Sequence, residues 1–303
     1  MSTEEARMSQ STRRLTQATL LTLLPLIGGL PTSADTSTGD HHRMPRLTPC
    51  SERYPLVATL RPRHVLQSAK EAIREDFAST RDWGTETNAE LLGALTSGLV
   101  EPALRAHYPQ HSSSPSDADQ QDVPRGGFGF YTKEKSLQHT DRACLHYRLR
   151  FEANFDFVKG GKLPGLYGGD APSGGEEVTG ENGFSLRLMW RKDGQGELYP
   201  YTVGHEGDSM GRGSWHFPTG RWVTVEQEVI LNEPEGRDGI VRLWIDGWPV
   251  LERREMVLRT TPTLGIDGVM FSTFFGGTGE EWRTPHDQHA DFSVFRLYAP
   301  EPR

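Results

Sequence analysis

The sequence is poor in cysteine, has no excess of basic residues and is only 35% hydrophobic. Two cysteines among 303 residues exclude a small domain held together by many disulfides. Lys and Arg number 33 against 41 Asp and Glu, and the resulting net charge of −8 argues against broad nucleic-acid binding. The low hydrophobic content excludes a polytopic membrane protein. The net charge says nothing about the potential inside one groove, so it does not exclude a polyanionic ligand.

Glycine, proline and aromatic residues are well represented. The chain has 33 Gly, 20 Pro and 9% aromatic residues, a composition typical of strands joined by tight turns. Its length is enough for one large all-β domain or for two smaller domains.

The first 34 residues have the order of a secretory signal peptide. A polar start is followed by an uncharged stretch over residues 15–34, which ends in small residues at 32–34. A single membrane anchor and a disordered tail are the alternatives, and Pro25 and Pro31 disfavour the anchor. We predict that residues 1–34 are a signal peptide, that the protein is secreted, and that the mature chain has no membrane attachment.

An oxidising compartment would allow the two cysteines to pair. Cys50 precedes the predicted helical region, and Cys144 begins a predicted strand. The sequence does not show whether the two backbones approach closely enough for a disulfide, so a bridged pair and two free thiols both stay open.

Residues 35–125 are predicted to form a polar leader, a helical extension and a linker. Apolar residues at helical spacing predict helices over residues 62–80 and 87–108, and the serine-rich segment 110–125 is typical of a loop. From residue 126 on, short alternating strands follow one another without long helices between them. This pattern predicts an all-β jelly roll, a sandwich of two antiparallel sheets, over residues 126–303.

Two consecutive predicted strands carry polar side chains on one face. Ser185 and Arg187 alternate with apolar residues in the first strand, and Tyr199 and Tyr201 share a face of the second. The Asp-Gly-Gln-Gly segment between them predicts a hairpin, which would bring these side chains to one surface. Taken alone, such residues are more typical of a solvated or packed sheet face than of a catalytic site.

A glycine-rich segment over residues 159–169 surrounds Lys162. Glycines let the backbone approach a ligand closely, although such a segment is most often only a turn. The segment has no Walker pattern, so the sequence gives little support to phosphate binding.

Four motifs follow in order: FDFVKGGKLPGL at residues 155–166, FSLRLMWR at 184–191, GELYPY at 196–201 and FFGG at 274–277. Through them the sequence resembles polysaccharide lyase family 14 over about residues 126–298. That family includes alginate and glucuronan lyases from algal viruses, molluscs and fungi. The resemblance implies a β-jelly roll with a cleft for an anionic polysaccharide.

The resemblance also implies a catalytic set at the matching positions: Lys162, Ser185, Arg187, Tyr199 and Tyr201. A polyuronate lyase removes the proton at carbon 5 of a uronate and expels the oxygen at carbon 4, which leaves a 4,5-unsaturated non-reducing end. Arg187 and Lys162 would stabilise the enolate charge, and Ser185 would orient a carboxylate or a phenol. The two tyrosines would exchange the protons, in an order that the sequence leaves open.

Three further side chains are expected to bind substrate: Arg191, His205 and Lys159. This chemistry requires no cofactor and no metal, and the pair His286 and His289 has no evident third ligand. We expect an anionic polysaccharide as the partner, no nucleic acid, and a monomeric protein.

Other functions also fit a sandwich of this kind. A non-catalytic carbohydrate-binding protein would need the groove but not the acid–base set. A glycoside hydrolase would need two carboxylates about 5–9 Å apart, and Glu197 stands alone on the candidate strands. A structural secreted protein is a third alternative. No motif distinguishes mannuronate, guluronate and glucuronate.

Overall fold

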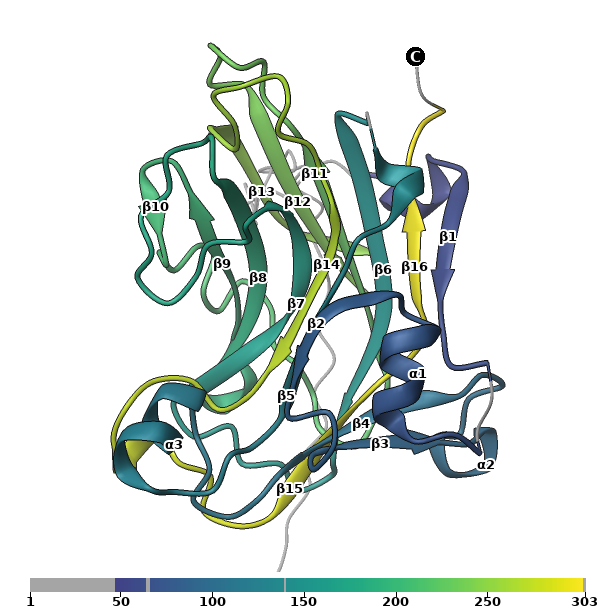
Figure 1. Cartoon of the computed structure of the whole chain (residues 1–303), viewed down its shortest axis with the longest axis vertical. Coiled ribbons are helices and arrows are strands. Elements are labelled where there is room, and N and C mark those ends of the chain that lie inside the picture. The colour runs from purple at the N-terminus through teal and green to yellow at the C-terminus, as the bar shows by residue number, and fades with distance from the viewer. Residues whose placement is uncertain (1–46, 64–65, 139, 302–303) are drawn as a thin grey trace, which may run out of the picture. The chain divides into compact units, whose positions relative to one another are not determined.

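The computed structural model describes residues 47–63, 66–138 and 140–301. The predicted signal peptide lies outside the described residues. Within the described part of the chain, sixteen strands form two antiparallel sheets, one of nine strands and one of seven (Figure 1). The predicted two-sheet sandwich is therefore confirmed.

The nine-stranded sheet has the order β13-β12-β11-β6-β15-β4-β3, and β16 pairs with both β1 and β6. Its strands are β1 (Leu56–Leu60), β3 (Ala89–Leu92), β4 (Ala103–Tyr108), β6 (Arg142–Phe151), β11 (Val223–Ile230), β12 (Gly239–Ile245), β13 (Trp248–Met256), β15 (Gln288–Phe292) and β16 (Phe295–Tyr298).

The seven-stranded sheet has the order β10-β9-β8-β7-β14-β5-β2. Its strands are β2 (Ser79–Trp83), β5 (Phe128–Thr132), β7 (Gly160–Gly169), β8 (Gly183–Arg191), β9 (Gly196–Thr202), β10 (His205–Glu206) and β14 (Gly268–Thr273). The helices of the described residues are short: α1 (Ala69–Glu75), α2 (Ala94–Ser97), α3 (Pro115–Gln121) and the 3-10 turns η1 (Cys50–Glu52), η2 (Lys135–Leu137), η3 (Lys192–Gly194) and η4 (Glu280–Trp282).

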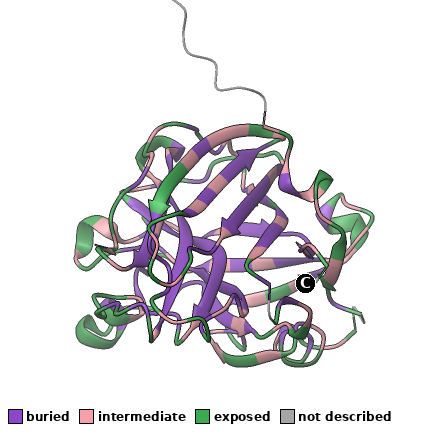
Figure 2. Cartoon of the chain, turned by 90° about the horizontal axis from the view of Figure 1, so that it is seen from above, coloured by how far each residue is buried: buried purple, intermediate pink, exposed green. Residues whose placement is uncertain are grey.

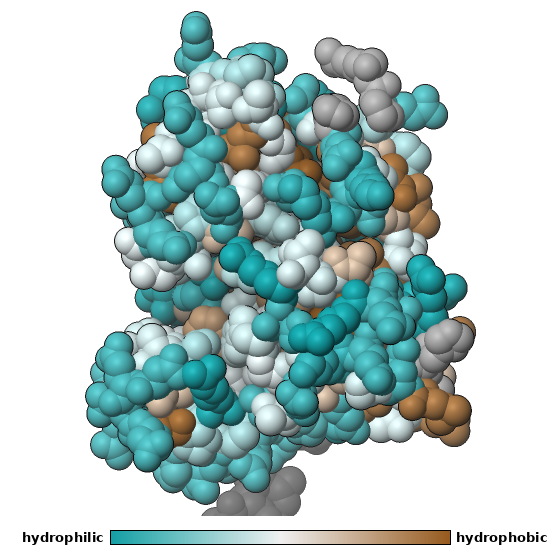
Figure 3. Space-filling view, in the orientation of Figure 1, coloured by the Kyte–Doolittle hydropathy of each residue, from teal (hydrophilic) through white to brown (hydrophobic). Residues whose placement is uncertain are grey.

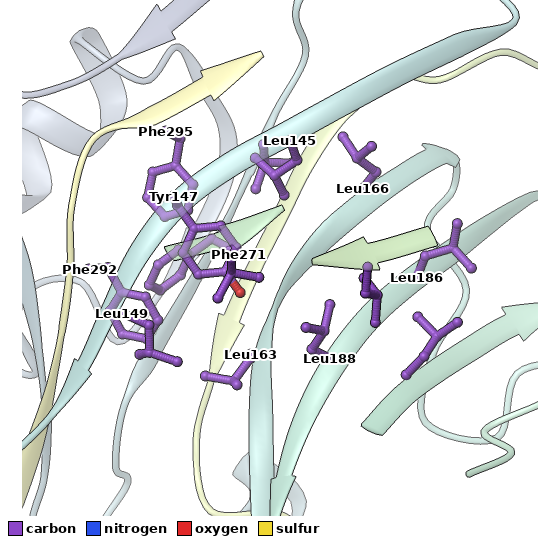
Figure 4. Close-up of a cluster of buried hydrophobic side chains, with 14 of the residues drawn as sticks. Leu145, Tyr147, Leu149, Leu163, Leu166, Leu186, Leu188, Phe271, Phe292 and Phe295 are labelled. Atoms are coloured by element: carbon purple, nitrogen blue, oxygen red, sulfur yellow. The ribbon is translucent and has the colours of Figure 1, made fainter. Parts of the chain in front are cut away.

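The hydrophobic core lies between the two sheets (Figure 4). β6 contributes Leu145, Tyr147 and Leu149, and β8 of the other sheet contributes Leu186 and Leu188, all of them buried. Every second residue of a strand faces the same way, so the alternation in the sequence predicts this burial. Figure 2 shows the result, with buried strands in the middle and exposed residues concentrated in the loops.

The helix predicted over residues 62–80 is mostly wrong. Of the described residues in this range only Ala69–Glu75 are α-helical, and Ser68 and Glu71 form a capping box at the start of α1. The chain then enters β2, which pairs with β5. Ile73 is fully buried, so the apolar spacing did reflect burial, but pairing with a distant strand set the local structure.

The helix predicted over residues 87–108 is also wrong. The range holds β3 and β4, which pair with each other, and only the single turn α2 between them. Gly98 ends that turn in the left-handed region at a φ of 71°. Leu104, Ala106 and Tyr108 are buried and alternate with polar residues, which is the period of a strand.

The segment 110–125 is not only a loop. Ser114 caps α3, and Pro115 occupies its first turn. Strands β1 to β4 all precede residue 126 and belong to the two sheets. The predicted boundary at residue 126 therefore does not separate a helical extension from the sandwich.

Cys50 and Cys144 form a disulfide, with their Cα atoms 5.7 Å apart. The bridge joins η1 to β6 across a sequence separation of 94 residues. Closing a loop of this length restricts the unfolded chain strongly, so the bridge fixes the start of the described chain to a central strand.

Removing this disulfide should lower the free energy of unfolding by about 3–5 kcal/mol, because the closed loop is long. Urea unfolding of a Cys50→Ala/Cys144→Ala variant beside the wild type measures the difference. A loss below about 1 kcal/mol would show that the bridge adds little to stability.

Within the described part of the chain, no helix has the length and apolar character needed to span a membrane. The face in Figure 3 is largely hydrophilic, and the hydrophobic residues on it form separate patches.

Candidate active site

The candidate site lies on the face of the seven-stranded sheet that points away from the core. Adjacent strands β8 and β9 pair Arg187 with Tyr199 and Ser185 with Tyr201, while β7 and β8 pair Lys162 with Met189. Directly paired residues project from the same face. The structure therefore joins the predicted hairpin surface and the glycine-rich segment in one place.

Lys162 is almost fully buried against an aromatic ring. Its Nζ lies 3.7 Å from the centre of the Tyr199 ring and 3.0 Å from the Met189 sulfur. No carboxylate pairs with it among the residues that the structure describes. Burial, followed by nearby Arg187 and Arg191, holds the pKa of Lys162 well below its usual value, and Glu197 opposes this only in part. The neutral amine, which can accept a proton, is therefore more favoured here than in an exposed lysine.

Arg187 is a buried cation with unused hydrogen-bonding capacity. Its side chain is 4% exposed, Nη1 donates to the Ser272 hydroxyl at 3.4 Å, and Nε has no partner in the structure. Burial lowers the pKa of Arg187, but an arginine stays protonated in proteins. No carboxylate among the described residues pairs with it. A buried cation without an anion is costly, so this geometry favours an anionic ligand.

The two tyrosines lie beside each other, with ring centres 5.8 Å apart. The Gly175 N–H donates to the Tyr201 hydroxyl oxygen at 3.0 Å. Burial, followed by the neighbouring Tyr201, raises the pKa of Tyr199. Gly207 faces both phenols, because a Cβ at this position would lie 2.7 Å from the Tyr199 oxygen and 3.1 Å from the Tyr201 oxygen. Only a glycine leaves this space free.

Ser185 is hydrogen-bonded to the neighbouring loop, which contains Pro172. It is fully buried, and its hydroxyl donates to the Pro172 carbonyl at 2.6 Å. Pro172 precedes Gly175, whose N–H reaches Tyr201. The sequence predicted that Ser185 orients a carboxylate or a phenol, whereas here it holds the loop that contacts a phenol.

The three side chains expected to bind substrate already have carboxylate partners. Arg191 pairs with Glu197 at 2.5 Å, Lys159 with Glu281 at 3.2 Å, and His205 with Asp208 at 2.7 Å. None of the three lines the cleft that contains Lys162 and Arg187. Ser185, Tyr199 and Tyr201 are also absent from that lining, so the role of all these residues in binding stays a prediction.

Glu197 has a role that the sequence did not reveal. It is fully buried and accepts hydrogen bonds from Arg191, Arg212 and Ser209. Burial alone would raise the pKa of Glu197, but these donors hold it below its usual value. The carboxylate fixes Arg191, one of the cations that acts on Lys162. A local sequence pattern could not show that Ser209 and Arg212, which follow later in the chain, donate hydrogen bonds to this carboxylate.

A cleft of about 370 Å³ opens at this site. It is lined by Trp83, Ser114, Pro115, Ser116, Tyr131, Lys162, Ser173, Gly174, Arg187, Met270, Ser272, Phe274, Gly277 and Thr278. The lining includes two basic side chains and no acidic one, although the whole chain is acidic. A polyanionic ligand, which the net charge did not exclude, therefore fits this lining, and a pair of carboxylates for glycoside hydrolysis is not found in it.

One group of described residues is close enough together to hold a metal: Cys50, Cys144 and Glu226. Its two cysteines are joined in the disulfide, so their thiolates are not available as ligands.

Sequence comparison shows the family of this chain. The family model described as Polysaccharide lyase 14 matches residues 97–295. The chain belongs to polysaccharide lyase family 14. The match begins before the predicted boundary at residue 126 and includes β4 and α3. Among curated proteins, no sequence match reaches significance.

Solved structures of lyases resemble this lyase in fold. The alginate lyase from Aplysia kurodai is 31% identical, with a TM-score of 0.70, and the match covers 81% of this chain and 100% of that one. The alginate lyase vAL-1 from Chlorella virus is 18% identical, with a TM-score of 0.63, over 81% of this chain and 100% of that one. A variant of alginate lyase Aly36B, solved with an alginate tetrasaccharide, is 20% identical, with a TM-score of 0.63, over 82% of this chain and 95% of that one. The chain is a polysaccharide lyase.

Proposed function

We propose that this polysaccharide lyase cleaves alginate by β-elimination and leaves a 4,5-unsaturated uronate at the new non-reducing end. One observation carries the proposal. Lys162 and Arg187 line one cleft, and neither has a carboxylate partner among the described residues. Both lie beside Tyr199, because the Lys162 amine contacts its ring and Arg187 pairs with it across β8 and β9. The 31% identity to an alginate lyase, matched over that protein's whole length, supports alginate as the polymer.

Arg187 binds the carboxylate of the uronate that reacts. The proton at carbon 5 is a very weak acid while the neighbouring carboxylate keeps its full charge. A guanidinium offers two parallel N–H donors to a carboxylate, and Arg187 has the unused Nε to provide them. A fixed cation in a partly dry cleft stabilises the enolate charge as it develops.

Lys162 takes the proton from carbon 5. A base must be unprotonated, and the lowered pKa of Lys162 makes its neutral form accessible. This replaces the assignment expected from the sequence, in which Lys162 stabilised charge and one of the two tyrosines removed the proton. The Tyr199 ring, 3.7 Å from Nζ, fixes the amine in place.

Tyr201 gives its proton to the glycosidic oxygen that leaves carbon 4. The Gly175 N–H already donates to its oxygen, so the phenolate formed by proton loss is stabilised at once. Lys162 gains the proton that carbon 5 loses, and the electron pair of that bond forms the double bond as the carbon–oxygen bond breaks. Tyr199, whose pKa is raised, stays a phenol between the base and the acid.

Ultraviolet absorbance of the conjugated product tests the function. Alginate, glucuronan and pectate are supplied separately to the purified chain. We expect absorbance to rise with alginate. A rise with glucuronan alone would keep a polyuronate lyase but reject alginate, and binding without any product would favour the non-catalytic carbohydrate-binding alternative.

The pH dependence of kcat/KM tests the assignment of the base. The acidic limb of the profile reports the pKa of Lys162 in the free enzyme. Arg191→Gln removes a cation that lowers this pKa, so the limb should move to higher pH. Arg253→Gln, on β13 of the other sheet, is the control and should leave the limb in place. A limb that does not move in Arg191→Gln would assign it to another group.

We further propose that the protein is secreted. The order of residues 1–34 is that of a signal peptide, and a disulfide such as Cys50–Cys144 persists in oxidising compartments. Mass spectrometry of the protein from the culture medium should find a mature start near residue 35. Full-length chain retained in the cell would contradict secretion.

A further inference from the structure

A row of paired residues leads from the proposed catalytic centre to the edge of the same sheet. Arg187 donates to Ser272 on β14, Ser272 pairs with Gly129 on β5, and Gly129 pairs with Trp83 on β2. Directly paired residues share a face, so this row crosses the cleft face of the sheet. In Figure 1, β7, β14, β5 and β2 follow one another in this order.

Trp83 provides an aromatic surface in the cleft. Gly129 has no side chain, and a Cβ there would lie 2.3 Å from Nε1 and 2.6 Å from Cε2 of Trp83, so the indole fills that space. Phe274 contacts the indole edge-on, with ring centres 5.8 Å apart. Trp83 lines the same cleft as Lys162 and Arg187. An indole held in this way offers a large apolar face against which a sugar ring packs.

Arg81 adds a fixed cation beside this surface. It pairs with Tyr131 across β2 and β5, and its guanidinium carbon lies 3.7 Å from the centre of the Tyr131 ring. Nη2 donates to the Asp170 carbonyl at 3.1 Å. Arg81 is exposed, and no carboxylate of the described chain pairs with it. A stacked guanidinium keeps its charge and its remaining donors available to an anion.

We propose that Trp83, Tyr131 and Arg81 form an additional subsite for a second uronate residue of the polymer. Trp83 packs against the pyranose ring, and Arg81 pairs with the carboxylate. The inference rests on the proposed function. The Lys162 amine, which takes the proton, contacts Met189 on β8, whereas the indole lies over Gly129 on β5, three strand spacings or about 14 Å away. One pyranose ring does not span this distance, so the residue bound here is not the one that loses its proton.

The test compares two charge reversals, Arg81→Glu and Arg253→Glu. Both arginines are exposed, both lie on an edge strand, and both donate a hydrogen bond to a backbone carbonyl. The two variants carry the same net charge, so a general repulsion of the polymer affects both equally. We expect Arg81→Glu to raise KM for alginate about tenfold or more with kcat within about twofold, because like charges then face each other. Arg253→Glu should match the wild type.

The effect should depend on chain length and on salt. For the shortest oligouronate that is still cleaved, KM of Arg81→Glu should approach the wild-type value, since such a substrate does not reach the subsite. Added salt should reduce the difference between the two variants, because an exposed charge is screened. If Arg81→Glu does not fold, Arg81→Gln should raise KM for the polymer about threefold.

Failure of the subsite and failure of the proposed function give different results. A wild-type chain that forms no unsaturated product from any polyuronate rejects the function. A wild-type chain that cleaves alginate, beside an Arg81→Glu variant with the same KM as Arg253→Glu, overturns the subsite alone. An Arg81→Glu variant in which KM rises by the same factor for oligouronates of every length would also overturn the subsite.

Discussion

Lys162→Arg should lower kcat on alginate by about 10²- to 10⁴-fold, the usual contribution of a general base. Arginine keeps a positive charge at the position but does not give up its proton in a protein. The lowered pKa of Lys162, caused by burial and by Arg187 and Arg191, makes the neutral amine accessible in the parent chain. Initial rates of unsaturated product, with KM measured separately, give the result.

The same substitution distinguishes a base from a charge. If Lys162 only stabilised the enolate, Lys162→Arg would keep much of the activity and Lys162→Ala would lose it. Lys159→Arg is the matched control, since it makes the same change in the same glycine-rich segment at a half-exposed residue outside the cleft. Its rate should stay within about twofold of the parent, as expected for an exposed ion pair. Near-normal kcat in Lys162→Arg would remove Lys162 from the role of base.

Tyr201→Phe should lower kcat by about 10²- to 10³-fold and leave KM within about threefold. The variant removes the proton donor and the oxygen that accepts the Gly175 N–H, but it keeps the aromatic ring. A glycosidic oxygen is a poor leaving group without a proton, so the loss should fall on the chemical step.

Tyr167→Phe is the control for this change. Tyr167 lies on β7 of the same sheet and is buried, and its hydroxyl donates to the Thr132 carbonyl at 2.9 Å. Losing that hydrogen bond should cost about 1 kcal/mol of stability and little activity. A large rise in KM with unchanged kcat in Tyr201→Phe would assign Tyr201 to binding instead of catalysis.

The sequence predicted the centre of the site because its parts are local. β8 and β9 follow each other through a short turn, so alternation alone places Arg187 and Tyr199 on one face. The glycine-rich strand β7 joins them by pairing with β8. The family resemblance selected these residues from other polar sheet residues, and of the five it selected, Lys162 and Arg187 line the cleft.

Distant segments supply the rest of the site, and the sequence could not place them. Ser272 and Trp83 reach the cleft through strand pairing, which no local pattern specifies. The Gly175 N–H is a backbone group of a loop, and since every residue except proline has such a group, the sequence does not indicate that this one contacts Tyr201. The strands β3 and β4 were predicted as one helix because short apolar runs fit both periods, and strand pairing decided between them.

The ratio of double bonds to new reducing ends tests the central claim most directly. In β-elimination each cleaved linkage gives one unsaturated end and one reducing end. Incubation of the wild-type chain with alginate should therefore release absorbing product and reducing ends in equal amounts from the first time point. Reducing ends without matching absorbance would show hydrolysis and would contradict the elimination assigned to Lys162, Arg187 and Tyr201.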